Sequence, residues 1–152
     1  MKKKTVLLIN GPNLNLLGKR ETKIYGKTTL KKLVKKLKKK ANVFKINLKT
    51  FQSNSESKLI EKIQISKNLV KYIIINASAY THTSIALRDA LLSVKIPFIE
   101  VHISNIYSRE NFRANSWLSD ISSGIICGLG TKGYFLALDA INEKIIKNKN
   151  NC

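Results

Sequence analysis

The chain has 152 residues, 43% of them hydrophobic, so we expect a single domain over residues 1–152 that buries a core without disulfides or metals. Its 28 basic residues outnumber nine acidic ones, and the net charge of +19 suits nucleic acid, an anionic membrane surface or an anionic substrate. No apolar stretch approaches the ~20 residues of a membrane-spanning helix, so we expect no membrane partner.

The first half of the chain alternates apolar runs with amphipathic segments. Residues 5–10 (TVLLIN) form an apolar run stopped by Gly-Pro, which predicts a buried strand entering a long loop over residues 11–28. Leucines and a valine at helical spacing predict a lysine-rich amphipathic helix over residues 29–40. Apolar and polar residues alternate over residues 44–51, which predicts a half-buried strand, and a second helix is expected over residues 55–67.

The second half continues the alternation. Residues 72–76 (YIIIN) lack polar alternation and predict a central parallel strand covered on both faces. A third helix is expected near residues 87–94, and a strand over residues 97–101. The remaining expected elements are a strand over 123–127, a closing helix over 134–145 and a polar tail from about 148 to 152.

Five strands that each precede a helix indicate right-handed crossovers and an open parallel sheet. We therefore predict an α/β, flavodoxin-like, doubly wound fold with a five-stranded parallel sheet in a three-layer α/β/α arrangement. Ligands bind outside the carboxyl ends of the strands in such sheets. The candidate segments are residues 11–28, 77–83 and 102–113, which follow the first, third and fourth strands.

Polar chemistry is concentrated in these three segments and at the strand ends that lead into them. They hold both histidines of the chain and three of its four arginines. A lone histidine is more often structural than catalytic, but two at the predicted ligand edge favour a functional role. The polar candidates are Asn10, Asn13, Asn15, Arg20, Tyr25, Asn76, Tyr80, Thr81, His82, His102, Ser104, Arg109 and Arg113.

Two glycine patterns do not fit the nucleotide motifs that they resemble. Gly11 to Lys19 is two residues too long for a phosphate loop, and Arg20 replaces its hydroxyl residue. The glycines at 128, 130 and 133 fit G-x-G-x-x-G, but no later strand carries a ribose-binding acid, so we expect them to serve a tight turn and close helix packing. The histidines lack zinc-site spacing, and we expect neither a metal nor a cofactor. General acid–base chemistry by tyrosine, histidine and a carboxylate remains, which suggests elimination or isomerisation.

Five ordered blocks resemble the type II 3-dehydroquinate dehydratase family, and together they cover nearly the whole chain. They are INGPNLNLLGKRETKIYG (9–26), FQSNSESKLIEKIQ (51–64), IINASAYTHTSIALRDAL (74–91), IEVHISNIYSRENFR (99–113) and GIICGLGTKGY (124–134). The resemblance implies the third step of the shikimate pathway, an anti elimination of water from 3-dehydroquinate through an enolate. It implies no cofactor and no Schiff-base lysine.

The resemblance also implies roles for residues at matching positions. Tyr25 would be the base that removes the proton beside the ketone, and Arg20 would favour its phenolate form by opposite charge. His102 would be the general acid that protonates the departing hydroxyl. Glu100, two residues earlier on the same face of a strand, would orient its ring. Asn76 would hold a water against the enolate oxygen.

Further positions would bind substrate and complete the site. The substrate carboxylate would meet the backbone amides of Ile103 and Ser104, while Arg113 and His82 would grip hydroxyls. Asp89 would reach the site from a neighbouring subunit, because the family assembles as trimers packed into dodecamers. Residues 13–26, which include the substrate-binding Asn13, resemble the family's closing lid.

Three positions depart from the family pattern: Ser57 and Ser78 stand where glycine is usual, and Ala114 follows Arg113 where histidine is common. Ser78 has the largest expected effect, because a side chain there could change the loop if the position needs a left-handed conformation.

Two alternatives remain open alongside the resemblance. The lysine-rich helix could mark a nucleic-acid-binding α/β module without catalytic activity, although it lacks interleaved aromatic residues and A/T-rich coding also explains the lysines. A flavin- or phosphate-binding signalling domain of the same fold is the second, but no aspartate ends the first, third or fourth strand. Cys127 and Cys152 form no disulfide or metal pattern, which favours the reducing cytoplasm.

Overall fold

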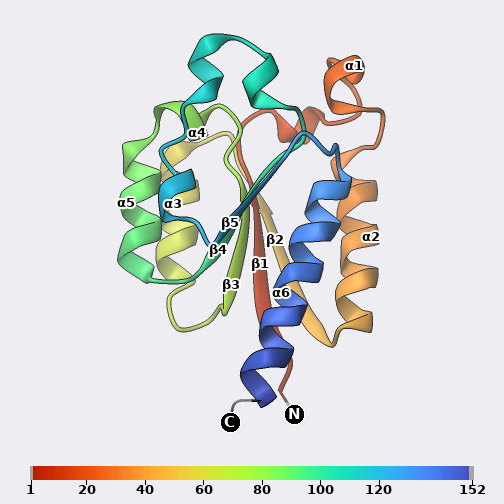
Figure 1. The fold of residues 1–152 in the computed structure, drawn as a ribbon, viewed down its shortest axis with the longest axis vertical. Helices are drawn as coiled ribbons and strands as arrows, with labels where there is room; N and C mark the ends of the chain where they lie inside the picture. The colour runs from red at the N-terminus through yellow and green to blue at the C-terminus, as the bar shows by residue number, and fades with distance from the viewer. Residues whose placement is uncertain (1, 151–152) are drawn as a thin grey trace.

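A five-stranded, entirely parallel sheet forms the centre of the molecule in a computed structural model that describes residues 2–150 (Figure 1). The strand order is β2-β1-β3-β4-β5, which is the flavodoxin-like order, and the predicted fold class is confirmed. The strands are β1 (Lys4–Asn10), β2 (Ile46–Gln52), β3 (Tyr72–Asn76), β4 (Phe98–His102) and β5 (Gly124–Cys127).

Two pairs of helices cover the two faces of the sheet. Helices α2 (Leu30–Val43) and α6 (Lys132–Asn150) pack on one face, and α3 (Glu56–Ile65) and α5 (Ile85–Val94) pack on the other (Figure 1). Side-chain hydroxyls cap three of these helices, because Thr29, Ser55 and Ser84 each accept a hydrogen bond from the amide three residues later. None of the described helices is long and apolar enough to cross a membrane.

The core explains why β1 carries an unbroken apolar run. Val6 and Leu8 pack in the cluster under α2 and α6, whereas Leu7 and Ile9 pack in the cluster under α3 and α5. All four side chains are at most 1% exposed, and each contributes about 1.5–3 kcal/mol through burial. A strand buried on both faces holds the carboxyl edge of the sheet as a rigid base for the loops that follow it.

Two predicted boundaries are wrong. Phe44 does not begin a strand: it caps α2, and Lys45 turns the chain through a left-handed conformation (φ 56°) before β2 starts at Ile46. Residues 148–150, predicted as part of a polar tail, continue α6 instead. Lysines in its last turn favour the helix because they oppose the negative end of its dipole. Residues 151–152, including Cys152, lie outside the described residues.

The three loops predicted to carry the chemistry meet at the carboxyl edge, at the top of Figure 1. The first contains η1 (Leu14–Leu16) and α1 (Thr22–Tyr25), the second contains α4 (Tyr80–Thr83), and the third contains η2 (Ile106–Ser108) and η3 (Asn111–Ala114). Gly11 brings the first two loops together, because a Cβ at this position would lie 2.3 Å from the carbonyl oxygen of Ala77. The segment before β5 carries a further short helix, η4 (Ser119–Ile121).

Candidate active site

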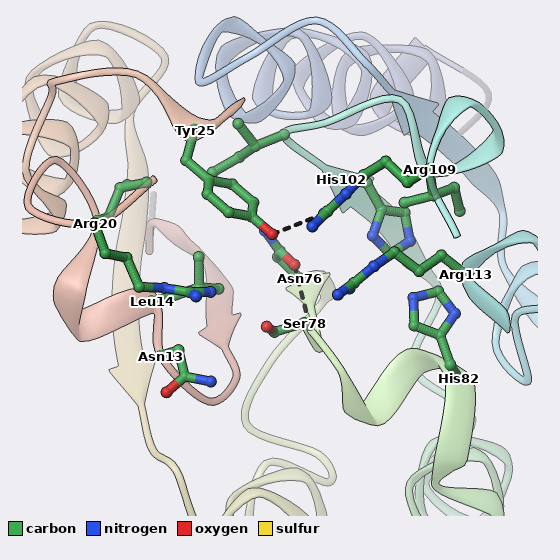
Figure 2. Close-up of a pocket in the computed structure, with 13 residues that line it drawn as sticks. Asn13, Leu14, Arg20, Tyr25, Asn76, Ser78, His82, His102, Arg109 and Arg113 are labelled. Atoms are coloured by element: carbon green, nitrogen blue, oxygen red, sulfur yellow. Dashed lines mark hydrogen bonds between the residues drawn. The ribbon is translucent and has the colours of Figure 1, made fainter. Parts of the chain in front are cut away.

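A pocket opens between the three loops at the carboxyl edge of the sheet (Figure 2). Asn13 and Arg20 flank it on one side, and His82 and Arg113 flank it on the other. Eight of the eleven residues assigned from the sequence line this one pocket, while Glu100, Ser104 and Asp89 do not. The lining residues are Asn13, Leu14, Leu17, Arg20, Tyr25, Asn76, Ser78, His82, His102, Ile103, Ile106, Arg109 and Arg113.

Two guanidinium groups flank Tyr25. Arg109 Nη1 donates a hydrogen bond of 2.7 Å to the Tyr25 hydroxyl and one of 3.1 Å to Ser104 Oγ (Figure 2). Arg20 lies beside the ring, with Cζ 5.2 Å from the ring centroid, and forms an ion pair of 2.8 Å with Glu21. Sequence analysis placed Arg109 at this edge but gave it no role. The structure makes Arg109, and not Arg20, the direct partner of the phenol oxygen.

His102 and Glu100 form a buried pair at the end of β4. His102 Nε2 lies 2.9 Å from Glu100 Oε1, and the two residues are 4% and 0% exposed. Ser116 Oγ donates to Oε1 at 2.6 Å, and Ser119 Oγ donates to Oε2. Burial alone would raise the pKa of Glu100, but the hydrogen bonds from His102, Ser116 and Ser119 outweigh it and lower that pKa. Glu100 is therefore a carboxylate that only accepts, so Nε2 of His102 donates to it and Nδ1 is left for a ligand.

His82 is held as a second imidazole next to His102. Its ring stacks on that of His102 with centroids 6.4 Å apart, and its Nδ1 donates to the carbonyl oxygen of Asn115 at 2.7 Å. Burial lowers the pKa of His82, and the nearby His102 and Arg113 lower it further, against the opposing effect of the Asn115 hydrogen bond. A neutral ring that donates from Nδ1 presents Nε2 as an acceptor, which suits a substrate hydroxyl.

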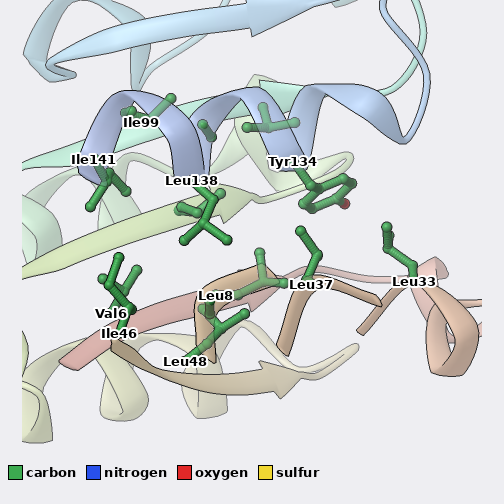
Figure 3. Close-up of a cluster of buried hydrophobic side chains, with 14 of the residues drawn as sticks. Val6, Leu8, Leu33, Leu37, Ile46, Leu48, Ile99, Tyr134, Leu138 and Ile141 are labelled. Atoms are coloured by element: carbon green, nitrogen blue, oxygen red, sulfur yellow. The ribbon is translucent and has the colours of Figure 1, made fainter. Parts of the chain in front are cut away.

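Asn76 is oriented from behind by a tyrosine that sequence analysis counted only as a helix residue. Tyr134 is fully buried at the end of the core cluster under α2 and α6 (Figure 3). Its hydroxyl accepts from Asn76 Nδ2 at 2.9 Å and donates to Asn10 Oδ1 at 2.7 Å. Asn76 Oδ1 accepts from the amide of Ser78 at 3.1 Å. Burial raises the pKa of Tyr134, despite the hydrogen bond from Asn76, so its hydroxyl remains a neutral link in this network.

Replacing Tyr134 by phenylalanine is expected to lower the free energy of unfolding by about 2–4 kcal/mol, because one buried donor and one buried acceptor lose their partner. Asn10 and Asn76 are 1% and 4% exposed, so water does not readily replace the hydroxyl. Urea denaturation measures the change. The same substitution at Tyr107, which is 63% exposed, should change the stability by less than about 0.5 kcal/mol. Equal effects at both positions would contradict a role for the network.

Ser78 has a left-handed backbone (φ 54°), which is the conformation considered above for this position and one that glycine adopts most readily. We expect Ser78→Gly to raise the free energy of unfolding by about 0.5–1 kcal/mol, because relief of backbone strain exceeds the added entropy of the unfolded chain. Ser57→Gly is the matched control: Ser57 lies inside α3, where glycine should lower stability by a similar amount. Chemical denaturation of both variants should therefore give opposite signs, and a loss of stability at both positions would refute the strain.

The remaining assigned residues lie around or outside the pocket. Neither the amide of Ile103 nor that of Ser104 donates to another group among residues 2–150, so both are available to an anion. Asp89 is exposed on α5 and borders a separate surface depression that also contains Tyr107 and Trp117. Within the described part of the chain, no three His, Cys, Asp or Glu side chains are grouped closely enough to hold a metal ion.

A flavodoxin-like α/β fold with a phenol, two imidazoles and three guanidiniums around one pocket defines an acid–base enzyme for a small anionic molecule. Residues 4–142 match the family described as "Dehydroquinase class II", and the chain belongs to this family.

Named relatives agree with this membership. The chain is 68% identical over 142 residues to a 3-dehydroquinate dehydratase of Buchnera aphidicola subsp. Baizongia pistaciae, covering 93% of this chain and 92% of the relative. It is 58% identical over 140 residues to a protein of the same name from Proteus mirabilis, covering 92% and 95%. The crystal structure of type II dehydroquinase from Butyrivibrio crossotus superimposes with a TM-score of 0.91 at 45% identity, over 93% of this chain and 99% of that one. The nucleic-acid-binding alternative finds no support in these relatives.

Proposed function

We propose that this chain catalyses the reversible dehydration of 3-dehydroquinate to 3-dehydroshikimate, the hydro-lyase reaction of the shikimate pathway. The observation that carries the proposal is the paired arrangement of Tyr25 with Arg109 and of His102 with Glu100 around one cationic pocket. An elimination of water requires a base and a separate acid, because one proton leaves carbon while another joins the departing hydroxyl. Each of the two groups here has its own charged partner.

The substrate carboxylate binds where backbone N–H groups and a guanidinium face the pocket. The free amides of Ile103 and Ser104 form an anion cradle for the substrate carboxylate, and the guanidinium of Arg113 adds opposite charge. Glu110 accepts a hydrogen bond from Arg113 Nε, which fixes the orientation of that guanidinium. His82 Nε2 accepts from a substrate hydroxyl, because its Nδ1 is already bonded to Asn115.

The chemical steps follow from the hydrogen bonds. Tyr25, as the phenolate that Arg109 stabilises, removes the proton beside the ketone, and the electron pair of the broken C–H bond forms the enolate. Asn76 has one side-chain N–H left after its bond to Tyr134, and this N–H holds a water against the enolate oxygen. The enolate then expels the hydroxyl, which takes a proton from His102 Nδ1 and leaves as water.

The lid of this proposal is a small part of the first loop. Leu14 and Leu17 are buried in the core cluster, so residues 14–17 are anchored, whereas Glu21 and Thr22 are exposed. Gly18 and Gly26 flank the exposed part with positive φ values of 82° and 80°, which makes them natural hinges. Closure would move Arg20 and Tyr25 together, because both lie between these glycines.

We further propose that the enzyme assembles as trimers packed into a dodecamer in the cytoplasm. The depression around Asp89 supports such an interface, since Ile85 and Trp117 at its rim are 52% and 38% exposed. Asp89 lies outside the pocket of its own chain, as a residue serving a neighbouring subunit would. Light scattering after gel filtration should give a native mass twelve times the 17.2 kDa of one chain, and a monomeric mass would refute the assembly.

The deciding experiment follows the conjugated enone product by ultraviolet absorbance after 3-dehydroquinate is added to the purified protein. The geometry is tested with substrate in which deuterium replaces one of the two hydrogens on the carbon between the ketone and the departing hydroxyl. Anti elimination removes only the hydrogen opposite that hydroxyl. No enone from the protein at any pH between 6 and 9 would refute the proposed function.

A further inference from the structure

A short segment between η3 and β5, residues 115–120, contacts His82 directly and contacts Glu100, the partner of His102. Ser116 and Ser119 donate hydrogen bonds to the carboxylate of Glu100, and the carbonyl oxygen of Asn115 accepts from His82. This segment lies outside the pocket, and none of its residues lines it. It therefore acts on the site only through Glu100 and His82.

Arg88 and Thr81 hold this segment in place. Arg88 Nη1 donates to the carbonyl oxygen of Trp117 at 2.8 Å, and Arg88 Nη2 donates to Asp120 Oδ2 at 2.9 Å. The amide of Trp117 donates to the carbonyl oxygen of Thr81 at 3.0 Å. Contacts on both sides of Ser119 thus fix the position from which its hydroxyl reaches Glu100.

We propose that Ser119, together with Ser116, is a positioning residue for the dehydration: its hydroxyl keeps Glu100 as the carboxylate partner of His102. This inference rests on the proposed function. A single proton can lie on either member of the Glu100–His102 pair. When it lies on His102, the imidazolium carries N–H groups at both nitrogens and Nδ1 can protonate a leaving hydroxyl. When it lies on Glu100, His102 is neutral and a far weaker acid.

Because Glu100 is buried, hydrogen bonds from the two serines decide whether it is ionised. Glu100 has no exposed surface, so no water solvates its negative charge, and desolvation favours the neutral acid. Three donors counter this effect: His102 and Ser116 at Oε1, and Ser119 at Oε2. Ser119 provides the only protein hydrogen bond to Oε2 among the described residues, so without it half of the carboxylate is buried and unpaired.

Ser119 gives a cleaner test than Ser116. The hydroxyl oxygen of Ser116 also accepts from the amides of Leu118 and Ser119, at 3.1 and 3.2 Å, so its removal changes the turn itself. The hydroxyl of Ser119 bonds to Glu100 and shapes no turn. Ser122, two residues beyond this segment, offers a matched control, since its hydroxyl donates to the backbone carbonyl of Ser119 at 2.8 Å and not to Glu100.

We expect Ser119→Ala to lower kcat about tenfold with less than about a twofold change in KM, because acid catalysis weakens while substrate contacts remain. The alkaline limb of the kcat profile should move to higher pH, because loss of the Ser119 donor raises the pKa of Glu100 and the pair keeps its single proton to higher pH. Ser119→Thr should restore both properties, and Ser122→Ala should leave them unchanged. The other ionisable groups that face His102 stay the same in all variants: Arg20, Tyr25, His82, Arg109 and Arg113.

Nitrogen NMR of histidine-labelled protein gives a readout that needs no turnover, and the chain has only two histidines to assign. In Ser119→Ala, at neutral pH, a smaller fraction of His102 should be in the charged form than in wild type because the shared proton moves to Glu100, while His82 should be unchanged. Ser116→Ala should shift His102 in the same direction, which covers the case that Ser119→Ala does not fold. Wild-type titration and wild-type kcat in Ser119→Ala would overturn the inference. An inactive wild type would instead reject the proposed function, and the NMR comparison would still test the pair.

Discussion

Tyr25→Phe should lower kcat by about 10³-fold or more, because the substitution removes the one oxygen that takes the proton from carbon. KM should change little. The aromatic ring keeps its place between two guanidiniums, with the Cζ atoms of Arg20 and Arg109 at 5.2 and 5.4 Å from its centroid. Initial rates from enone absorbance measure both constants. The same atom is removed by Tyr72→Phe at the start of β3, the opposite end of that strand from the pocket, and that variant should retain wild-type rates.

A pair of arginine variants separates the two guanidiniums beside Tyr25. In the structure Arg109 contacts the phenol oxygen at 2.7 Å, whereas Arg20 lies against the ring and pairs with Glu21. Because Arg109 donates to the phenol oxygen that takes the proton, Arg109→Ala should lower kcat about 10²-fold. A comparable loss in Arg20→Ala would mean that lid closure brings Arg20 onto the same oxygen.

The Tyr25 prediction has its own contradicting outcome. A Tyr25→Phe variant that keeps more than about a tenth of wild-type kcat would reject Tyr25 as the base.

Glu100→Gln should lower kcat by about 10²–10³-fold while preserving the shape of the side chain. The amide carries no charge to stabilise the imidazolium of His102, so the leaving hydroxyl meets a weaker acid. Ser119 can turn its hydroxyl to accept from the new amide, which keeps the buried site filled. Glu143→Gln on the exposed side of α6 is the matched control, and it should leave kcat unchanged. Retention of wild-type kcat by Glu100→Gln would remove the carboxylate from the mechanism.

Glu100→Gln should also change how the free energy of unfolding depends on pH. The pKa of Glu100 is lowered in the folded protein relative to an ordinary glutamate, so its ionised form stabilises the fold at pH values above about 4.3. This contribution is lost as the pH falls through the lower folded pKa. Urea denaturation should therefore show Glu100→Gln to be less stable than wild type at pH 7, with a difference that shrinks on acidification. A difference that grows toward low pH would contradict the direction of the shift.

Local patterns were sufficient for most of the fold. The apolar run at residues 72–76 coincides with β3, because a strand buried on both faces leaves no polar alternation to confuse. Errors occurred where the local pattern was ambiguous. Phe44 continues the alternation of β2 but packs against the core from the end of α2. The last turn of α6 has no apolar signal of its own, and backbone hydrogen bonding from the preceding turns extends the helix.

The sequence by itself determined the order of strands and helices along the chain, the edge that carries the chemistry and the residue types gathered there, because strand and helix periodicity depends on neighbours a few positions apart. The tertiary structure alone decided which partner each functional group meets. Tyr25 and Arg109 are 84 positions apart, and Asn76 and Tyr134 are 58 apart. Ser119 meets Glu100 from a segment with no regular pattern. Such contacts depend on how whole loops pack over the sheet. A shift of a few tenths of an ångström makes or breaks a hydrogen bond, and residue spacing along the sequence does not determine positions that accurately.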